Sequence, residues 1–212
     1  MNKKVLVFSA VSVVLVGFAL ASYVFRTKEV SQVQQNAHLL LRADAPRLGS
    51  PIAPVTVVEF FDPECETCRR FHPMTKMLLQ EFDGKIQMVF RYAPFHPNSK
   101  FAVQILEAAR QQNRYWEVLD VLYQYQPQWG DHHNPRPELI WTYLPNVAGL
   151  DIERLKVDMN DPKIQTMLDK DLSDGRQLGV QRTPQFFVNG EPLLDFGYEQ
   201  LRQLVLSHIP KP

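Results

Sequence analysis

Two cysteines three residues apart constrain this chain more than any other feature of its sequence. Cys65-Glu66-Thr67-Cys68 follows a run rich in β-branched and aromatic residues, 55–61, and opens a helical pattern that continues to about residue 82. At the start of a helix the first thiol faces unpaired backbone N–H groups and the positive end of the helix dipole, which favour the thiolate. The second thiol, one turn further along, is placed to resolve a mixed disulfide. The spacing therefore predicts redox chemistry at a strand-to-helix junction.

Two other uses of the cysteine pair stay open. An inert structural disulfide is disfavoured because so short a loop contributes little stabilisation through chain entropy. A Cu(I) or Zn²⁺ site needs further ligands, for which the sequence offers His72, one turn beyond Cys68, and the loop residues His132 and His133. We expect these histidines to be surface or capping residues, and we expect no metal.

The overall composition excludes several classes of protein. The 212 residues carry 23 basic and 23 acidic side chains, so bulk charge gives no basis for binding nucleic acid or an anionic membrane surface. A hydrophobic fraction of 45% is too high for a disordered chain. Two cysteines cannot staple a disulfide-rich scaffold or fill a four-cysteine zinc site. The chain is expected to be globular, with no nucleic-acid partner.

The N-terminal segment is expected to meet a membrane. An uncharged run of 21 positions, Val5–Phe25, covers about 30 Å as a helix, the thickness of the hydrocarbon core of a bilayer. We expect residues 1–26 to form an uncleaved signal-anchor and residues 27–47 a spacer. The body would then lie on the periplasmic side of the bacterial inner membrane, an oxidising compartment. Cleavage near Ala21, after an Ala-Leu-Ala sequence, is the alternative and would leave a soluble periplasmic protein.

The body, residues 48–212, alternates strand and helix signals. Strands are predicted at 55–61, 86–92 and 185–188, and Asn189-Gly190 is a strong hairpin signal before a partner strand. A long stretch of helical patterns, about 97–178, separates the second strand from the third. This order predicts a mixed α/β sheet with an inserted helical subdomain.

Taken together, the motifs resemble the thioredoxin fold, in the DsbA-like branch of thiol–disulfide oxidoreductases. The resemblance rests on Cys65 and Cys68, on Thr183-Pro184 before the strand–turn–strand, and on the helical insertion between them. It implies a cis bond at Pro184, which stands against the cysteines, and a Thr183 backbone free to pair with a client strand. A proline in an ordinary turn is the local alternative. The resemblance also places Glu59 beneath the cysteines as a proton acceptor for the buried thiol, whereas an edge strand would leave it facing water.

The residues between the cysteines depart from the strongly oxidising members of that family. Glu66 puts a negative charge beside Cys65, and the histidine that would favour the thiolate is missing. A like charge about 4–6 Å away costs on the order of 1–3 kcal/mol before salt screening. Arg69 and Arg70, in the next turn, are candidates to offset part of that cost. The direction of electron flow, whether oxidation, reduction or isomerisation, therefore stays open.

These observations predict an exported thiol–disulfide oxidoreductase. Cys65 attacks or is attacked, Cys68 resolves, and Thr183-Pro184 positions the substrate, with no dissociable cofactor because the disulfide itself is the redox group. The expected partners are cysteine-containing exported proteins, a membrane or periplasmic redox partner that resets the cysteines, and the membrane through the N-terminal helix. The alternatives are a reductase or isomerase on the same scaffold, a copper-handling thiol protein, and a scaffold that only binds partner proteins.

Overall fold

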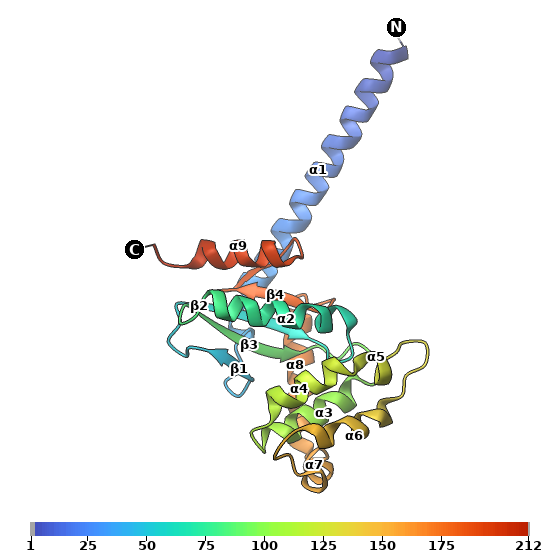
Figure 1. Ribbon diagram of the computed structural model, residues 1–212. Helices are drawn as coiled ribbons and strands as arrows, with labels where there is room; N and C mark the ends of the chain where they lie inside the picture. Colours follow the sequence, from blue (N-terminus) through green and yellow to red (C-terminus); the bar gives the residue numbers. More distant parts are fainter. Residues whose placement is uncertain (1–2, 212) are drawn as a thin grey trace.

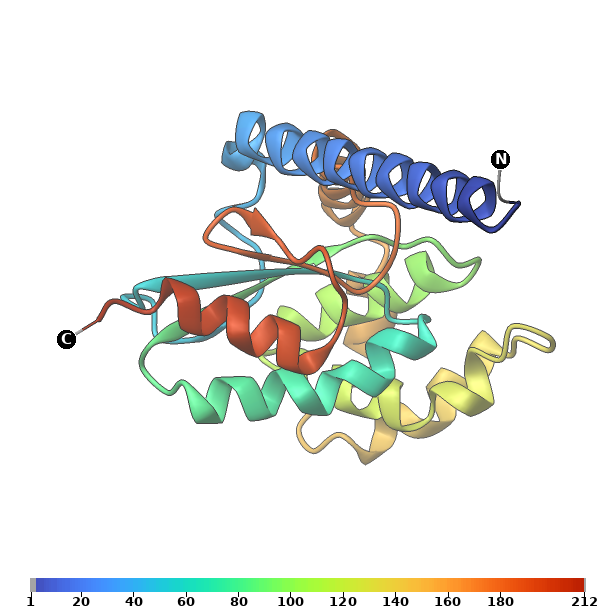
Figure 2. The same cartoon turned by 90° about the horizontal axis from the view of Figure 1, so that it is seen from above.

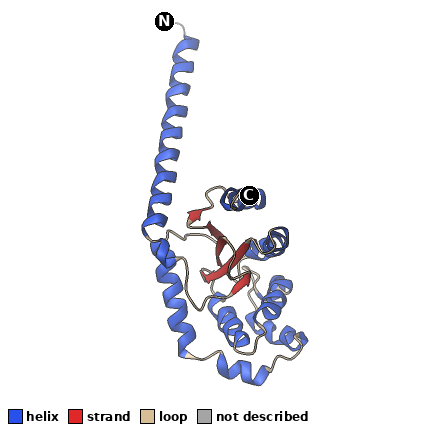
Figure 3. Cartoon of the chain, turned by 90° about the vertical axis from the view of Figure 1, so that its left-hand side faces the viewer, coloured by secondary structure: helices blue, strands red, loops and turns tan. Residues whose placement is uncertain are grey.

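The computed structural model describes the backbone of residues 3–211 and the side chains of residues 13–211. Within these residues one mixed sheet forms the centre of the domain (Figure 3), and hydrogen bonding places its strands in the order β1-β3-β2-β4-β5. Strand β2 pairs in parallel with β3, and the other neighbouring pairs are antiparallel. The strands are β1 Arg47–Gly49, β2 Val55–Phe61, β3 Ile86–Tyr92, β4 Gln185–Val188 and β5 Glu191–Pro192.

Strand β2 is the centre of this sheet, and its sequence suits that place. Every residue of β2 except Thr56 is buried, as expected for a β-branched and aromatic run covered on both faces. Alternate residues point to opposite faces, so Val57, Glu59 and Phe61 share one face and their neighbours share the other. The parallel register runs along the whole of β2 and β3, and the carboxyl ends of both strands therefore meet at one edge.

Helices cover both faces of the sheet (Figures 1 and 2). Helices α2, Glu66–Glu81, and α9, Tyr198–His208, lie on the face that carries Val57. Helix α8, Pro162–Gln177, and the C-terminal end of α1, Lys3–Gln35, lie on the opposite face. The position of a side chain along β2 therefore decides which helices it meets.

The remaining helices form a subdomain beside the carboxyl ends of β2 and β3 (Figure 1). The ring of Phe90 in β3 lies 5.0 Å from that of Trp116, and the Tyr92 hydroxyl donates to Glu107 at 2.7 Å, so one core continues from sheet to subdomain. The predicted mixed sheet with inserted helices is confirmed. The elements are α3 Ser99–Arg110, α4 Tyr115–Gln124, α5 Gln126–Trp129, α6 Ile140–Tyr143 and α7 Ile152–Asp158, with 3₁₀ turns at Ala37–Leu39, Pro137–Leu139 and Leu144–Asn146.

Helix α1 continues through much of the segment expected to be a spacer, and the structure differs from that expectation. The helix runs without a break to Gln35, and Val33 in its last turn is fully buried on the sheet face opposite α2. The Gln32 side chain donates to the carbonyl of Gln177 at the end of α8, at 2.9 Å, and Arg26 pairs with Asp195 at 2.9 Å. An apolar residue at one position of a polar stretch thus docks the helix on the domain.

The N-terminal part of α1 projects beyond the domain (Figure 3). Its described apolar side chains, from Val13 to Phe25, are mostly exposed. A search of the described part of the chain finds no helix that is both long and apolar enough to cross a membrane. Residues 5–12 of the predicted apolar run lie outside the residues whose side chains are described.

A buried ionic cluster holds the segment after α1 against the sheet. Arg91 in β3 has no exposed surface and pairs with Asp171 at 2.7 Å and with Asp174 at 2.6 Å, both on α8. The same guanidinium donates to the carbonyls of Leu39 and Leu40, and Arg42 pairs with Asp171 at 2.8 Å. Buried charges need such pairing, because an unpaired one costs several kcal/mol. The cluster joins α8, β3 and the chain between α1 and β1.

Val33 tests whether α1 is docked. Val33→Ala should lower the free energy of unfolding by roughly 1–3 kcal/mol, because it removes two buried methyl groups. Val157→Ala, at a position 72% exposed in α7, is the matched control and should change the free energy by less than about 0.5 kcal/mol. Urea denaturation of the full chain in detergent measures both. Equal values for the two variants would show that α1 is not part of the folded unit.

Candidate active site

The two cysteines lie where β2 gives way to α2. Cys65 is the N-cap of α2, with extended backbone angles (φ −71°, ψ 120°), and the helix begins at Glu66. The Cys65 N–H donates to the carbonyl of Asp62 at 3.1 Å, which closes the turn between strand and helix. Cys65 is 7% exposed, and Cys68, in the first turn, is fully buried. The helix start therefore presents one thiol near the surface and holds the other below it.

The environment of Cys65 favours its thiolate. The pKa of Cys65 is lowered from 9.0 to about 5, chiefly by the hydrogen bond from the Cys68 thiol. The side chain of Thr183 and the backbone N–H groups of Cys68 and Thr67 lower it further, against the opposing effect of burial. The direction of this shift agrees with the one expected at a helix start, but its chief cause is the Cys68 thiol.

Cys68 has the opposite environment. Burial raises its pKa well above the ordinary value, and both the hydrogen bond to Cys65 and the negative charges of Cys65 and Glu59 raise it further. The N–H of Asp62 donates to the Cys68 sulfur at 3.5 Å, which is a small compensation. The two thiols therefore differ sharply in acidity, with the low pKa on the less buried one.

Glu59 lies in the central strand and not at an edge, so the interpretation in which it faces water is wrong. It is 4% exposed and pairs in register with Phe90 of β3 and Phe186 of β4. Its side chain shares the face of Val57, which α2 covers. The pKa of Glu59 is raised to about 8, mainly by burial and secondarily by the charge of Cys65. At neutral pH this carboxyl group is mostly protonated.

Thr183 and Pro184 come from the far end of the chain to meet Cys65. The peptide bond between them is cis, which confirms the isomer implied by the resemblance. The Cys65 thiol donates to the carbonyl of Thr183 at 3.3 Å. Pro184 directly precedes β4, which pairs with β2, and this pairing fixes the loop beside the start of α2. The structure therefore brings Cys65, Cys68, Thr183 and Pro184 together.

The arginines named as candidates to offset the negative charge of Glu66 have other partners. Glu66 is exposed in the first turn of α2. Arg69 donates to the side chain of Gln126 at 3.0 Å, and Arg70 donates to the hydroxyl of Thr67 at 3.3 Å. Neither arginine forms an ion pair with Glu66 within the described residues. The negative charge of Glu66 is left to solvent.

Sequence reasoning missed a buried acidic cluster around the turn before Cys65. Asp62 has no exposed surface and accepts hydrogen bonds from the N–H groups of Glu64, Phe95 and His96, from the Ser99 hydroxyl, and from the His96 ring at 2.7 Å. Glu64 accepts two bonds from Asn98, at 2.7 and 2.8 Å. One signal could have found the cluster. These residues follow β2 and β3, and ligand-binding groups gather at the carboxyl ends of adjacent parallel strands.

The histidines named for a copper site lie elsewhere or have other partners. The ring of His72 bonds to Asp120 at 2.7 Å, and the ring of His132 stacks on that of His96 with centroids 4.8 Å apart. Over the described residues, no three side chains of the His, Cys, Asp and Glu types are arranged to hold a metal ion.

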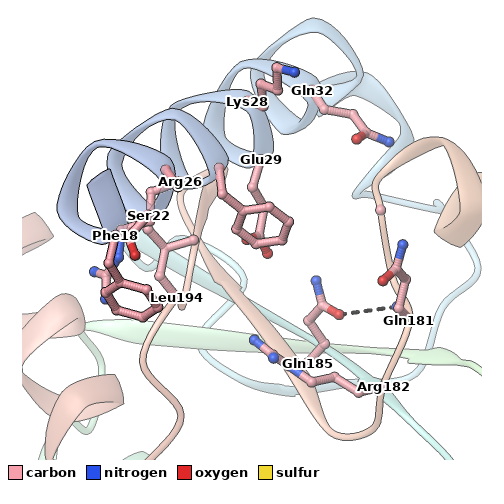
Figure 4. A pocket seen from close by; sticks show the side chains of 13 residues that line it. Phe18, Ser22, Arg26, Lys28, Glu29, Gln32, Gln181, Arg182, Gln185 and Leu194 are labelled. Carbon is pink, nitrogen blue, oxygen red and sulfur yellow. Dashed lines mark hydrogen bonds between the residues drawn. The ribbon is translucent and has the colours of Figure 1, made fainter. Parts of the chain in front are cut away.

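A hollow of about 1050 Å³ lies between α1 and the segment that holds Gln181 and Arg182 (Figure 4). Phe18, Ser22 and Arg26 of α1 form one wall, and Gln181 and Arg182 form the other. The cysteines do not line it. The hollow is therefore separate from the thiol site, and Arg182, which precedes Thr183 in the chain, is the lining residue nearest to that site in sequence.

Comparison with known proteins identifies the family. The family model described as thioredoxin matches residues 42–206, more than half of the chain. A solved structure, the thiol–disulfide exchange protein α-DsbA2 from Wolbachia pipientis, has a TM-score of 0.71 at 22% identity, covers 87% of this chain and 97% of that one, and shows likeness of fold. The probable disulfide bond formation protein D of Bacillus anthracis is 26% identical over 212 residues, which are 97% of this chain and 95% of that protein.

Other curated relatives are longer proteins. The Na⁺/H⁺ antiporter NhaA of Herminiimonas arsenicoxydans is 32% identical over 145 residues, which are 68% of this chain and 22% of the antiporter. The chain spans about a fifth of the length of that relative, so the likeness concerns only part of it. With its fold and cysteine site, the chain belongs to the thioredoxin family, in the DsbA-like branch of thiol–disulfide oxidoreductases.

The raised pKa of Glu59 predicts a pH-dependent stability. Its pKa is 4.5 in the ordinary state and about 8 in the fold. A raised folded pKa gives stability that is complete below the unfolded value and is lost as pH rises through the folded value. The parent should therefore lose free energy of unfolding as the pH rises from 5 to 8. A glutamine side chain does not ionise, so Glu59→Gln should lose less over the same range, by on the order of 3 kcal/mol.

The measurement is urea unfolding of the disulfide form, in which Cys65 does not titrate. Burial, the main cause of the shift, is independent of the state of Cys65. Glu66→Gln is the matched control, because this exposed carboxylate should leave the pH dependence of the parent unchanged. Parallel curves for Glu59→Gln and the parent would contradict the raised pKa.

Proposed function

We propose that this chain is an exported, membrane-anchored enzyme that exchanges disulfides with cysteine-containing exported proteins through its Cys-Glu-Thr-Cys centre. The observation that carries the proposal is the position of Cys65, which caps α2 and lies 3.3 Å from the carbonyl of Thr183, beside the cis bond and above buried Cys68. An extended client strand would pair with the backbone at Thr183 and so present its own cysteine to Cys65.

In the oxidising direction, the cysteines begin as a disulfide. A client thiolate attacks the Cys65 sulfur, the bond between Cys65 and Cys68 breaks, and Cys68 leaves with the electron pair and takes up a proton. A second client thiolate then attacks the client sulfur of the mixed disulfide and releases Cys65 as a thiolate. The client loses two electrons and two protons. Cys65 and Cys68 gain both electrons, Cys68 keeps one proton, and solvent takes the other.

Glu59 supplies the proton that Cys68 needs. Cys68 is a poor leaving group as a thiolate, because burial holds its pKa high. The carboxyl group of Glu59 is buried on the same side of β2 as α2, and with a pKa of about 8 it carries a proton at neutral pH. It can donate this proton when Cys68 leaves. In the reverse step, as a carboxylate, it can accept a proton from Cys68.

The low pKa of Cys65 favours oxidation of clients as the direction. A thiol of pKa about 5 is a stable thiolate at neutral pH and therefore a good leaving group. A second client thiol can then displace Cys65 from the mixed disulfide, which leaves the new disulfide in the client. The name of the Bacillus anthracis relative, a probable disulfide bond formation protein, supports the same direction. We therefore place reduction and isomerisation second. A redox partner in the membrane or periplasm would reoxidise the cysteines, and no dissociable cofactor is required.

Trapping of clients tests the roles of the two cysteines. Cys68→Ala keeps the accessible Cys65 thiolate but cannot resolve a mixed disulfide, so it should accumulate complexes with client proteins. Cys65→Ala leaves only buried Cys68 and should trap at least about tenfold less. Non-reducing gels followed by mass spectrometry measure both. Equal trapping by the two variants would overturn the assigned roles, and trapping by neither would overturn disulfide exchange with proteins.

Membrane anchoring rests on the apolar run Val5–Phe25. A bilayer-length run flanked by charges favours insertion of α1 with the domain outside. We expect the full chain to sediment with membranes and to remain there after an alkaline wash, whereas a variant lacking residues 1–26 should be released. Cell fractionation with N-terminal sequencing measures this. A soluble mature chain that begins at Ser22 would show that the signal is cleaved after Ala21 instead.

A further inference from the structure

His96 lies next to the redox centre but belongs to a different part of the chain. It sits in the loop between β3 and α3, and its ring Nδ1 is 2.7 Å from an oxygen of Asp62. Asp62 in turn bonds through its carbonyl to the Cys65 N–H and through its own N–H to the Cys68 sulfur. One residue therefore joins the imidazole to both cysteines.

The charges around Cys65 are mostly negative. Asp62 and Glu64 are buried carboxylates directly before it, and Glu66 is an exposed one directly after it. The side-chain oxygens of Asp62 accept several hydrogen bonds. Negative charges so close to Cys65 disfavour its thiolate form, because like charges repel. A cation close by would therefore add to the hydrogen bonds that already stabilise the thiolate.

The arginines near the cysteines along the chain have other surroundings. Arg69 donates to the side chain of Gln126 and Arg70 to that of Thr67, and Arg182 lines the hollow beside α1. His132, from the loop after α5, is exposed and stacks on the ring of His96 with centroids 4.8 Å apart. His96 itself is fixed by two contacts with Asp62, through its ring and through its backbone N–H. Its side chain is 26% exposed, so it can exchange a proton with water.

We propose that the His96 imidazolium, fixed by Asp62, is a positioning residue that neutralises the acidic cluster and thereby stabilises the Cys65 thiolate. Cys-Glu-Thr-Cys has no histidine between its cysteines, and His96 provides that charge from the end of the neighbouring parallel strand. The pKa of His96 is raised, first by its hydrogen bond with Asp62 and then, against burial, by the charges of Asp62, Cys65 and Glu64. The inference rests on the proposed function and deepens it, because it assigns a contribution to the reactivity of Cys65 beyond the hydrogen bond from Cys68.

Linkage makes the inference testable without any substitution. If the imidazolium stabilises the thiolate, the thiolate must stabilise the imidazolium by the same free energy. The thiolate exists only in the reduced protein, since oxidation converts Cys65 into a neutral disulfide. The pKa of His96 should therefore be higher in the reduced protein than in the oxidised one, by about half a unit to one unit. A purely structural contact with Asp62 would leave the two values equal.

The experiment is an NMR titration of the histidine rings in the full chain, held in detergent and prepared reduced and oxidised. His208, which pairs with Glu191 at the end of α9, is the internal control and should titrate identically in both preparations. Equal pKa values for His96 in the two states would overturn the inference. The test does not depend on any client, so its outcome is independent of whether client trapping succeeds.

A substitution gives the reciprocal measurement. His96→Asn retains a donor for Asp62 but no charge, and it should raise the pKa of Cys65, read from the ultraviolet absorbance of the thiolate, by about one unit. His133→Asn, two loop positions beyond Asp131 and exposed, should leave that pKa unchanged, and Glu66→Gln should lower it. A folded His96→Asn protein with the parental Cys65 pKa would overturn the inference. If His96→Asn does not fold, the titration of the unsubstituted chain still decides.

Discussion

The buried carboxylate of Asp62 is the contact on which the whole active site depends. It follows β2, yet most of its donors come from the loop after β3, so it ties together the two chain segments that leave the same edge of the sheet. Its backbone positions Cys65 and Cys68 at the start of α2. Loss of this carboxylate would leave several buried donors without a partner, and each of these costs about 1–3 kcal/mol.

Beside this edge of the sheet lie three titratable groups, Cys65, Cys68 and Glu59, whose pKa values are shifted in different directions. The hydrogen bond from the Cys68 thiol, followed by Thr183 and N–H groups at the helix start, keeps the pKa of Cys65 low, whereas burial is the main cause that raises the pKa values of Cys68 and Glu59. Neighbouring titratable groups with pKa values moved apart can take different chemical roles. Here the arrangement separates an acidic thiol at the helix start from two groups of raised pKa beneath it, which is what the proposed exchange of disulfides requires.

Local sequence signals were enough for the parts of this site that lie within one strand–turn–helix unit. The cysteine pair, the strands on either side of it and the Asn189-Gly190 hairpin, with φ of 46° and 88°, all follow from short-range patterns. The approach of Thr183 to Cys65 came from the resemblance, since no local pattern connects them. His96 and the docking of Val33 were missed, because each depends on packing between segments far apart in the chain. A lone histidine in a loop carries no periodic signal, and two valines three residues apart in the polar stretch after residue 26, Val30 and Val33, are too few to predict a buried helix face.

The docked end of α1 changes how the domain would be held at a membrane. The ion pair between Arg26 and Asp195 is half exposed on both sides and contributes about 0–1 kcal/mol, whereas burial of Val33 contributes roughly 1.5–3 kcal/mol. Their sum, about 2–4 kcal/mol, favours the docked position by roughly thirtyfold to a thousandfold. The end of α1 therefore packs as part of the domain. Val33 belongs to the same core as Phe187 of β4, the strand that Pro184 precedes, so α1 and the strand after Pro184 share one packed layer.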